Sequence, residues 1–533
     1  MKRFGSPRAI VSAGVALTLA AMALAALLAA SNVSRHFASV AGVPIEVFAP
    51  DDAAGGARSA RAAVVVVHGF SGNRQLMYGF GFALARSGYA AALVDLAGHG
   101  ASLDRLPGEF DEARYQKLAG NLATAMEYLH SDWDIPRERI AILGHSMGAS
   151  VVTRYAVEHP DVPATVAISL GEFGGRLPAQ ADRPRNLLIL VGAAEFAGFL
   201  NGSANGLRAA YPDGAAGQTY GDFAQGAARR LVIVPGVEHI TILFSPDTYR
   251  EVAQWIDLAF DSPAGGAGLA VDGRMGWVLL LYLAAMIGFY PLARLVWSGI
   301  PALATDAPRR PVPARRAVLA ILAAGVFAPP AMLAAPYRWM PLNVGNYAGV
   351  FFLIAGAVLW IAIALDRAIL RRQREPAAPQ RIAVAGKASL RMALAALALV
   401  VYALLTFGLT AHLTWTSFAL AGERVWMALV LFVFMLVYFW ADETLIWRPS
   451  ARTRLGLYAL SKTVLLVSLV AAILWLGGPF FLLILLPVML ALFVWHGLYA
   501  HWLHRLTGRP WVAAALNAAV FAWMIAATFP VVS

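Results

Sequence analysis

The sequence predicts an α/β domain with a mostly parallel sheet, followed by an all-α transmembrane helical domain. Six short apolar runs alternate with helix-like stretches in the first half of the chain, and long apolar segments fill the second half. Of the 533 residues, 59% are hydrophobic and 14% are charged, far from the average of soluble proteins. Part of the chain is therefore expected to lie in lipid.

The chain begins with a segment that we interpret as an N-terminal transmembrane signal anchor, residues 1–30. Residues 9–30 form an uncharged run of 22 residues after Lys2, Arg3 and Arg8, long enough to cross a bilayer as a helix. The run is longer than the usual apolar region of a signal peptide, which favours an uncleaved anchor, although small residues near position 30 leave cleavage open. Either alternative exports the residues that follow.

The α/β domain is predicted over residues 31–261. Its apolar runs lack polar alternation, which is typical of parallel strands covered on both faces. The predicted strands are Ala63–Val67, Ala90–Val94, Ile140–Leu143, Ala164–Ile168, Leu187–Val191 and Leu231–Val234. The clearest helices are Tyr115–His130, Val151–His159 and Tyr249–Phe260. The connection from Ile168 to Leu187 is short, so we expect no large lid there.

Residues 262–275 are predicted to be a glycine-rich linker, and residues 276–533 to be a transmembrane domain with about eight helices. The candidate spans are roughly 276–297, 317–335, 347–365, 392–412, 425–446, 455–476, 479–502 and 511–530.

Alternate loops of this domain differ in charge. Four of them hold 16 basic residues, whereas the loops between them hold only Arg338 and Arg424. By the positive-inside rule, the basic loops lie in the cytoplasm. The basic N-terminus gives the same orientation, which places residues 31–261 outside the cytoplasm. The sixteen are Arg309, Arg310, Arg315, Arg316, Arg367, Arg371, Arg372, Arg374, Arg381, Lys387, Arg391, Arg448, Arg452, Arg454, Arg505 and Arg509.

A strand, a tight turn and a serine indicate the chemistry. The run Ile140–Leu143 leads into Gly144-His145-Ser146-Met147-Gly148, the pattern of a nucleophile elbow, in which a strained turn lifts a serine hydroxyl above the sheet edge. The pattern alone is moderately specific, because the chain has 47 glycines. A serine at such a turn is more commonly a helix N-cap.

A second turn, His68-Gly69-Phe70, ends the strand Ala63–Val67. Backbone N–H groups at such a turn can face a developing oxyanion, so we assign the N–H groups of Phe70 and Met147 as the oxyanion-hole donors. His68 and His99 are expected to be structural, with hydrogen bonds to the backbone.

Three motifs together carry a family resemblance. The segments HGF at 68–70, DLAGHGAS at 95–102 and GHSMGAS at 144–150 resemble the α/β-hydrolase superfamily, in the branch of monoglyceride-lipase-like, dienelactone-hydrolase-like and serine-aminopeptidase-like proteins. The resemblance covers about residues 62–260 and does not extend to the membrane half. It implies an eight-strand, mostly parallel sheet and a triad in the chain order Ser, acid, His.

The remaining triad members follow from this order. His239 stands after the last strand, where the family places its histidine, and Glu195 follows the preceding strand. Many relatives have Asp at that position, so the longer Glu is a departure, and Glu172 and Asp222 remain alternatives for the acid. Ser146, Glu195 and His239 are the expected catalytic residues.

These features predict a membrane-anchored serine hydrolase that cleaves carboxylic esters, with amides as an option, through an acyl-enzyme on Ser146. No cofactor or metal is expected. The expected partners are the lipid bilayer and an ester derived from the membrane or cell envelope. Nucleic acid is not expected, because residues 31–273 carry 18 Lys/Arg against 25 Asp/Glu. The predicted location is a multi-pass bacterial inner membrane protein.

Two alternatives remain open at this point. An acyltransferase would use the same triad, and a transporter or signalling protein would keep the hydrolase-like domain only for binding. Asp442, Glu443, Lys462 and His496 fall within apolar spans, where ionisable groups are often functional. We favour the simpler interpretation that they lie near span ends or pair with one another.

Overall fold

The computed structural model describes two compact units. The first, here called the α/β unit, comprises Leu24–Val278, Thr410–Gly422 and Ala527–Ser533; the second, the helical unit, comprises Met1–Ala23, Leu279–Leu409 and Glu423–Ala526. The residues described are 7–29, 33–51, 60, 62–108, 111–172, 177–262, 274–298, 300, 311–372, 386–448 and 450–533. Most of the predicted linker (263–273) lies outside them, as do Lys2, Arg3, Arg309, Arg310, Arg374, Arg381 and part of the connection that was expected to lack a lid (173–176).

The α/β unit is built on a nine-stranded sheet in the order β1-β2-β4-β3-β5-β6-β7-β9-β8. All neighbours from β4 through β9 are parallel, which confirms the mostly parallel sheet. The family resemblance implied eight strands. The additional strand is β8, which has two residues, lies at the edge of the sheet and is antiparallel to β9. The strands are β1 Val33–Val40, β2 Val43–Pro50, β3 Ala63–Val67, β4 Ala90–Val94, β5 Ile140–His145, β6 Thr165–Ile168, β7 Leu187–Gly192, β8 Thr219–Tyr220 and β9 Arg229–Val234.

The hairpin of β1 and β2 was not among the predicted strands. Along β1 the side chains alternate between more and less buried, as expected for an edge strand with one face in solvent. Ala41 and Gly42 join the strands with φ of 48° and 81°, the positive values that a two-residue hairpin turn requires. The antiparallel pairing of β2 with β4 then extends the sheet beyond the predicted core strands.

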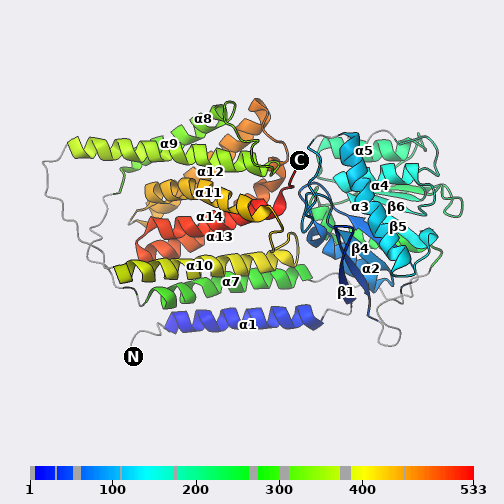
Figure 1. Ribbon diagram of the computed structural model, residues 1–533, viewed down its shortest axis with the longest axis horizontal. Helices are drawn as coiled ribbons and strands as arrows, with labels where there is room; N and C mark the ends of the chain where they lie inside the picture. The colour runs from blue at the N-terminus through cyan, green and yellow to red at the C-terminus, as the bar shows by residue number, and fades with distance from the viewer. Residues whose placement is uncertain are drawn as a thin grey trace. The chain divides into compact units, whose positions relative to one another are not determined.

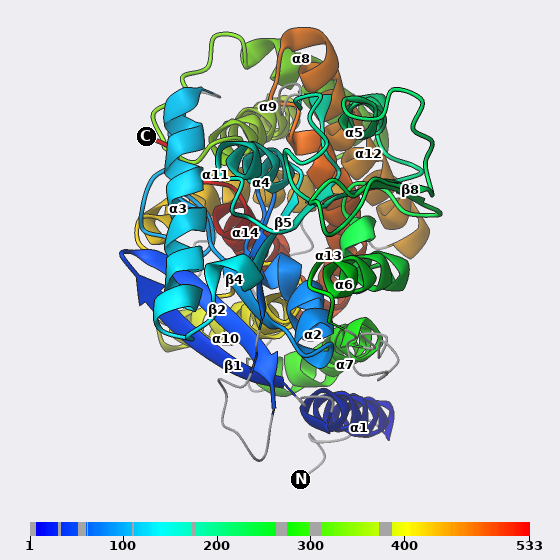
Figure 2. The same ribbon diagram turned by 90° about the vertical axis from the view of Figure 1, so that its right-hand side faces the viewer.

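Helices cover both faces of the sheet (Figure 1). Val64 and Val66 of β3 join the core on the face of α2 (Tyr78–Arg86) and α6 (Pro246–Ala259), whereas Val65 and Val67 pack with α3 (Glu112–Ser131) and α4 (Met147–Glu158). The two pairs of helices are seen on either side of β4 and β5 in Figure 2. Each fully buried valine contributes roughly 1.5–3 kcal/mol, so β3 is a central source of stability.

Two segments from the second half of the chain complete the α/β unit. The C-terminal tail forms a parallel bridge between Val532 and Leu106, and Val531 N–H donates to the carbonyl of Gly98 at 2.9 Å. In the segment Thr410–Gly422, the Thr416 hydroxyl accepts a hydrogen bond from Asn73 Nδ2 at 3.1 Å. The unit therefore contains residues well beyond the domain predicted at 31–261.

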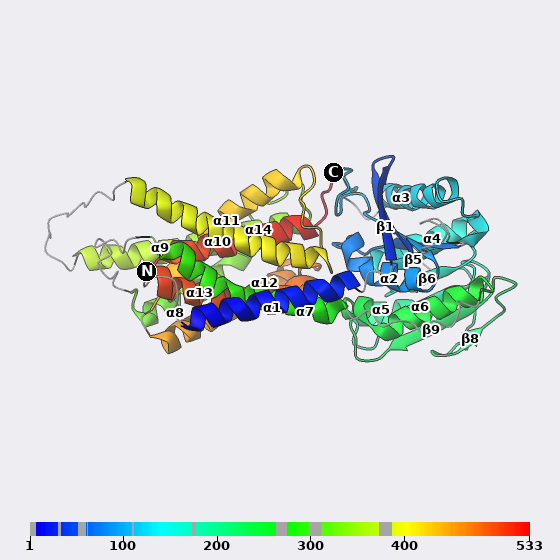
Figure 3. The same cartoon turned by 90° about the horizontal axis from the view of Figure 1, so that it is seen from below.

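The helical unit consists of long apolar helices that run roughly along a common direction (Figures 1 and 3). In the described part of the chain, nine helices are long and apolar enough to cross a membrane, at the nine places expected from the sequence. They are α1 Pro7–Ala29, α7 Arg274–Trp297, α8 Ala314–Ala331, α9 Gly345–Arg372, α10 Gly386–His412, α11 Arg424–Ile446, α12 Ala451–Leu476, α13 Leu482–Thr507 and α14 Pro510–Thr528.

Candidate active site

Ser146 lies in a strained turn between β5 and α4. Its φ is 55° and its ψ is −114°, a backbone conformation that costs on the order of 1–3 kcal/mol for a residue with a side chain. The turn is tight because a Cβ on Gly144 would lie 2.2 Å from the carbonyl oxygen of Gly148. Ser146 precedes α4 but its side chain makes no capping hydrogen bond, unlike the N-cap alternative.

The structure brings Ser146, His239 and Glu195 together in one chain of hydrogen bonds. Ser146 Oγ lies 3.0 Å from His239 Nε2, and His239 Nδ1 lies 2.8 Å from Glu195 Oε2. A carboxylate only accepts, so Nδ1 carries the proton of the neutral imidazole and Nε2 is left to accept from the serine. This tautomer is the one that a general base needs.

The two alternative acids lie elsewhere. Glu172 and Asp222 are exposed, and Asp222 accepts a hydrogen bond from the backbone N–H of Ala224 in its own turn. The side chain of Glu195 is fully buried against His239. Of the three candidates, Glu195 alone is paired with the imidazole in the geometry described.

Further contacts, which the sequence analysis did not identify, hold the acid and the imidazole. Glu195 Oε1 accepts hydrogen bonds from Ser169 Oγ at 2.6 Å and from Gly192 N–H at 3.0 Å. The ring of Phe199 packs on that of His239 with centroids 4.2 Å apart. Ser169 follows the predicted strand at 164–168, so its place at the carboxyl end of a parallel strand was the available signal.

The two expected oxyanion donors belong to backbone turns beside Ser146. A Cβ added to Gly69 would lie 3.0 Å from Ser146 Cβ, so the His68-Gly69-Phe70 turn passes directly against the serine. Met147 is the first residue of α4, and the first N–H groups of a helix have no partner within it and lie at its positive end. Both turns therefore approach the position where an oxyanion would form.

His68 and His99 make backbone hydrogen bonds, as expected for structural residues. His68 Nε2 accepts from Leu96 N–H at 3.1 Å, and His99 Nε2 accepts from Ser71 N–H at 3.3 Å. These bonds tie the turn after β3 to the turn after β4.

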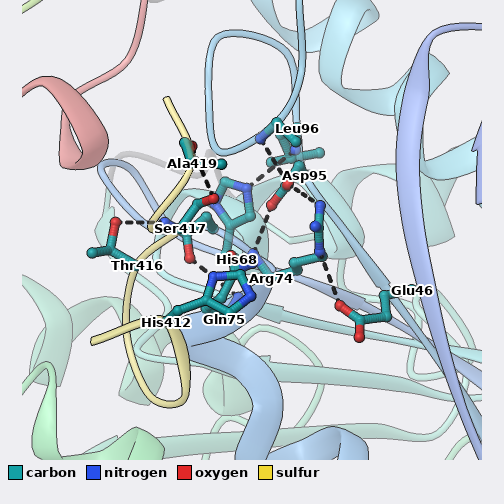
Figure 4. Close-up of polar contacts among 12 residues, drawn as sticks. Glu46, His68, Arg74, Gln75, Asp95, Leu96, His412, Thr416, Ser417 and Ala419 are labelled. Carbon is teal, nitrogen blue, oxygen red and sulfur yellow. Dashed lines mark hydrogen bonds and ion pairs between the residues drawn. The ribbon is translucent and has the colours of Figure 1, made fainter. Parts of the chain in front are cut away.

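A buried charge network supports the same two turns (Figure 4). Asp95 is fully buried and accepts from the backbone N–H groups of Arg74 at 2.8 Å and Ala101 at 2.9 Å. The Arg74 guanidinium pairs with Asp95 and donates to Glu46 Oε2 at 3.0 Å. The network thus fixes the segment that follows the predicted oxyanion turn to β2 and β4.

Comparison with known proteins is consistent with this architecture. Residues 58–182 match the family model described as serine aminopeptidase, S33. The α/β unit has the α/β-hydrolase fold. The family match covers the turn at Ser146 but ends before Glu195 and His239.

Two proteins of known sequence are similar to part of the chain. Two uncharacterized proteins from two strains of Mycobacterium tuberculosis are each 34% identical over 117 residues, which is 21% of this chain and 38% of each relative. The chain therefore matches less than half the length of these relatives.

Solved structures are similar over less than half of this chain. A soluble variant of monoglyceride lipase from Saccharomyces cerevisiae is 14% identical, covering 43% of this chain and 96% of the lipase, with a TM-score of 0.33. Dienelactone hydrolase from Anabaena variabilis is 20% identical, covering 43% of this chain and 99% of the other, with a TM-score of 0.30.

His145 gives the α/β unit an expected pH dependence of stability. Its Nε2 donates to the carbonyl oxygen of His239 at 2.9 Å. Burial lowers the pKa of His145 well below its usual value, and the nearby His239 lowers it further. Below a pH of about 6.5 the unfolded chain binds a proton that the folded site excludes, so stability falls by up to about 1.4 kcal/mol per pH unit.

The measurement compares the melting temperatures of wild type and His145→Gln, both in detergent, at pH values between 5 and 8. We expect the wild-type melting temperature to fall as the pH is lowered below 6.5. The variant lacks this imidazole, so its stability should depend on pH less steeply, by the equivalent of about one bound proton. Equal slopes in the two proteins would contradict the assignment of a buried neutral imidazole.

Proposed function

We propose that the protein is a membrane-anchored serine hydrolase that cleaves carboxylic esters through an acyl-enzyme on Ser146. The observation that supports this most directly is the hydrogen-bonded chain from Ser146 Oγ through His239 to Glu195, with distances of 3.0 and 2.8 Å, on a serine with positive φ. The family match to serine aminopeptidases over residues 58–182 supports hydrolase chemistry.

The proposed mechanism uses each of these groups. Ser146 Oγ attacks the ester carbonyl carbon as His239 Nε2 takes the hydroxyl proton, and Glu195 stabilises the imidazolium. The N–H groups of Phe70 and Met147 stabilise the oxyanion of the tetrahedral intermediate. His239 then gives its proton to the leaving alcohol oxygen. Water, activated by the same imidazole, attacks the acyl-enzyme and releases the acid.

The proposed location is a bilayer, with the α/β unit outside the cytoplasm.

 The nine long apolar helices and the arginine-rich alternate loops support this placement, because basic loops favour the cytoplasmic side. A domain held at a bacterial inner membrane in this way would meet esters of the membrane or the cell envelope. Lipid-derived or envelope-derived esters are therefore the substrate class that we propose.

Amide cleavage is the second candidate, because the matching family model is described as serine aminopeptidase. Paired ester and amide substrates with the same acyl group separate the two activities. A ratio of kcat/KM in favour of the amide would replace the ester proposal while leaving the nucleophile in place.

The nucleophile itself is tested with a fluorophosphonate probe on isolated membranes. We expect the wild-type chain to be labelled covalently and Ser146→Ala to be unlabelled, because the probe reacts with an activated serine. Ser150→Ala, which removes a hydroxyl in the first turn of the same helix, is the matched control and should label as the wild type does. Equal labelling of wild type and Ser146→Ala would remove the proposal.

A further inference from the structure

The helical unit contains a cavity of about 640 Å³ between α12 and α13, with the end of α11 at its border. This volume falls within the range of small-molecule sites in proteins. Its lining divides into two kinds of residue. Arg452, Arg454 and His501 gather near one end, and Leu466, Leu490 and Val494 line its apolar length.

The carboxylates at this cavity already have partners. Asp442 pairs with Lys462 Nζ at 2.5 Å, which agrees with the expectation that these intramembrane charges pair with one another. Glu443 Oε2 lies 2.6 Å from His504 Nε2, and its Oε1 accepts from Asn517 Nδ2 at 3.3 Å. The charge of Asp442 is thus matched by Lys462, whereas Glu443, which lines the cavity, also acts on Arg454.

The hydrogen bonds of Arg454 go to uncharged acceptors. Arg454 donates to the carbonyl oxygen of Arg448 at 3.2 Å and to His501 Nδ1 at 2.8 Å. Within the described ranges, no carboxylate lies at ion-pair distance from Arg452 or Arg454. Glu443 lines the same cavity and attracts Arg454, so two arginines face one carboxylate and a net positive charge remains at this end.

The apolar residues extend away from that charge. Leu466 lies twelve residues after Arg454 on α12, about 18 Å along a helix. On α13, Leu490, Val494 and Leu498 are spaced four residues apart and so share one helix face, and all three are substantially exposed. A cationic end with an apolar length of this size matches an anionic head group with an acyl chain.

We propose that this cavity binds an anionic phospholipid of the bilayer, with its phosphate at Arg452 and Arg454 and an acyl chain along Leu466, Leu490 and Val494. Guanidinium groups present paired donors that suit phosphate oxygens, and basic pockets between transmembrane helices bind anionic head groups. Both arginines lie in the first turn of α12, in a basic cluster that the positive-inside rule assigns to the cytoplasmic side, so the lipid comes from the cytoplasmic leaflet. The proposal requires the membrane placement proposed above but not the hydrolase chemistry.

The test uses the full chain purified in detergent and reconstituted into nanodiscs of phosphatidylcholine with a minor share of phosphatidylglycerol. Native mass spectrometry then measures which lipid stays bound. We expect wild type to retain phosphatidylglycerol preferentially and the double variant Arg452→Gln/Arg454→Gln to lose about 30-fold of that preference, since each arginine contributes about 1 kcal/mol.

Arg367→Gln is the matched control, because Arg367 is an exposed arginine of another basic cluster, on α9, and does not line the cavity. It should keep the preference. Val494→Trp, which fills the apolar length, should lower the amount of phosphatidylglycerol retained while both arginines remain. Equal losses in Arg367→Gln and the double variant, or no preference in wild type, would overturn the proposal. Fluorophosphonate labelling of all variants reports the hydrolase separately and is expected to be unchanged.

Discussion

Glu195→Gln is expected to lower kcat for an ester substrate by about 10⁴-fold. The carboxylate accepts the Nδ1 proton of His239 at 2.8 Å and is fully buried, so its charge acts on the imidazolium with little screening by water. An amide of the same shape carries no charge and can present N–H to the ring, which favours the tautomer that cannot take the Ser146 proton. Steady-state hydrolysis of a soluble ester by the detergent-solubilised chain measures the effect.

Glu172→Gln and Asp222→Asn are the controls for this experiment, because both are exposed and were alternatives for the acid. Each should leave kcat unchanged. If either of them abolished turnover while Glu195→Gln remained active, the acid of the proposed triad would have been assigned to the wrong residue.

Asp95→Asn is expected to destabilise the α/β unit by about 3 kcal/mol. The change removes the charge that faces the buried Arg74 guanidinium, and an unpaired buried charge is costly. Glu46 still contacts Arg74, which keeps the effect toward the lower end of the usual range. The temperature that halves fluorophosphonate labelling of the heated protein measures the loss, and it should fall by several degrees.

An exposed ion pair provides the matched control. Lys117 and Asp104 pair at 2.6 Å with side chains 39% and 41% exposed, so Asp104→Asn should change stability by less than about 1 kcal/mol. Similar midpoints for Asp95→Asn and wild type would show that the buried network does not stabilise the unit.

The central strands were predictable because burial on both faces leaves an uninterrupted apolar run. The strands β3 and β4 cover the residues predicted from such runs. The β1 and β2 hairpin was missed because the residues of β1 do not alternate regularly between apolar and polar, and Pro44 and Glu46 interrupt the apolar run of β2. The pairing of Asn73 with Thr416 spans 343 residues, and no local pattern in either segment indicates the other.

The candidate site was predictable where each residue sits at the end of a strand. Ser146, Glu195 and His239 each follow a strand of the parallel sheet, so one sheet edge brings them together. The partners that orient them were less predictable, since the bond of Ser169 to Glu195 depends on the side-chain geometry of two separate loops. The Arg74 network likewise joins segments far apart in the sequence, because Arg74 follows β3, Glu46 lies in β2 and Asp95 directly follows β4.

The C-terminal tail has a consequence for the order of synthesis. Val531 and Ser533 donate to carbonyl oxygens of Gly98 and Leu106 at 2.9 Å, in the turn that follows β4. Domains generally begin to fold as they leave the ribosome, N-terminal parts first. These backbone hydrogen bonds can form only after the whole helical unit has been translated. Residues made only after the helical unit thus complete a turn that was made before it, so the α/β unit gains these hydrogen bonds late in synthesis.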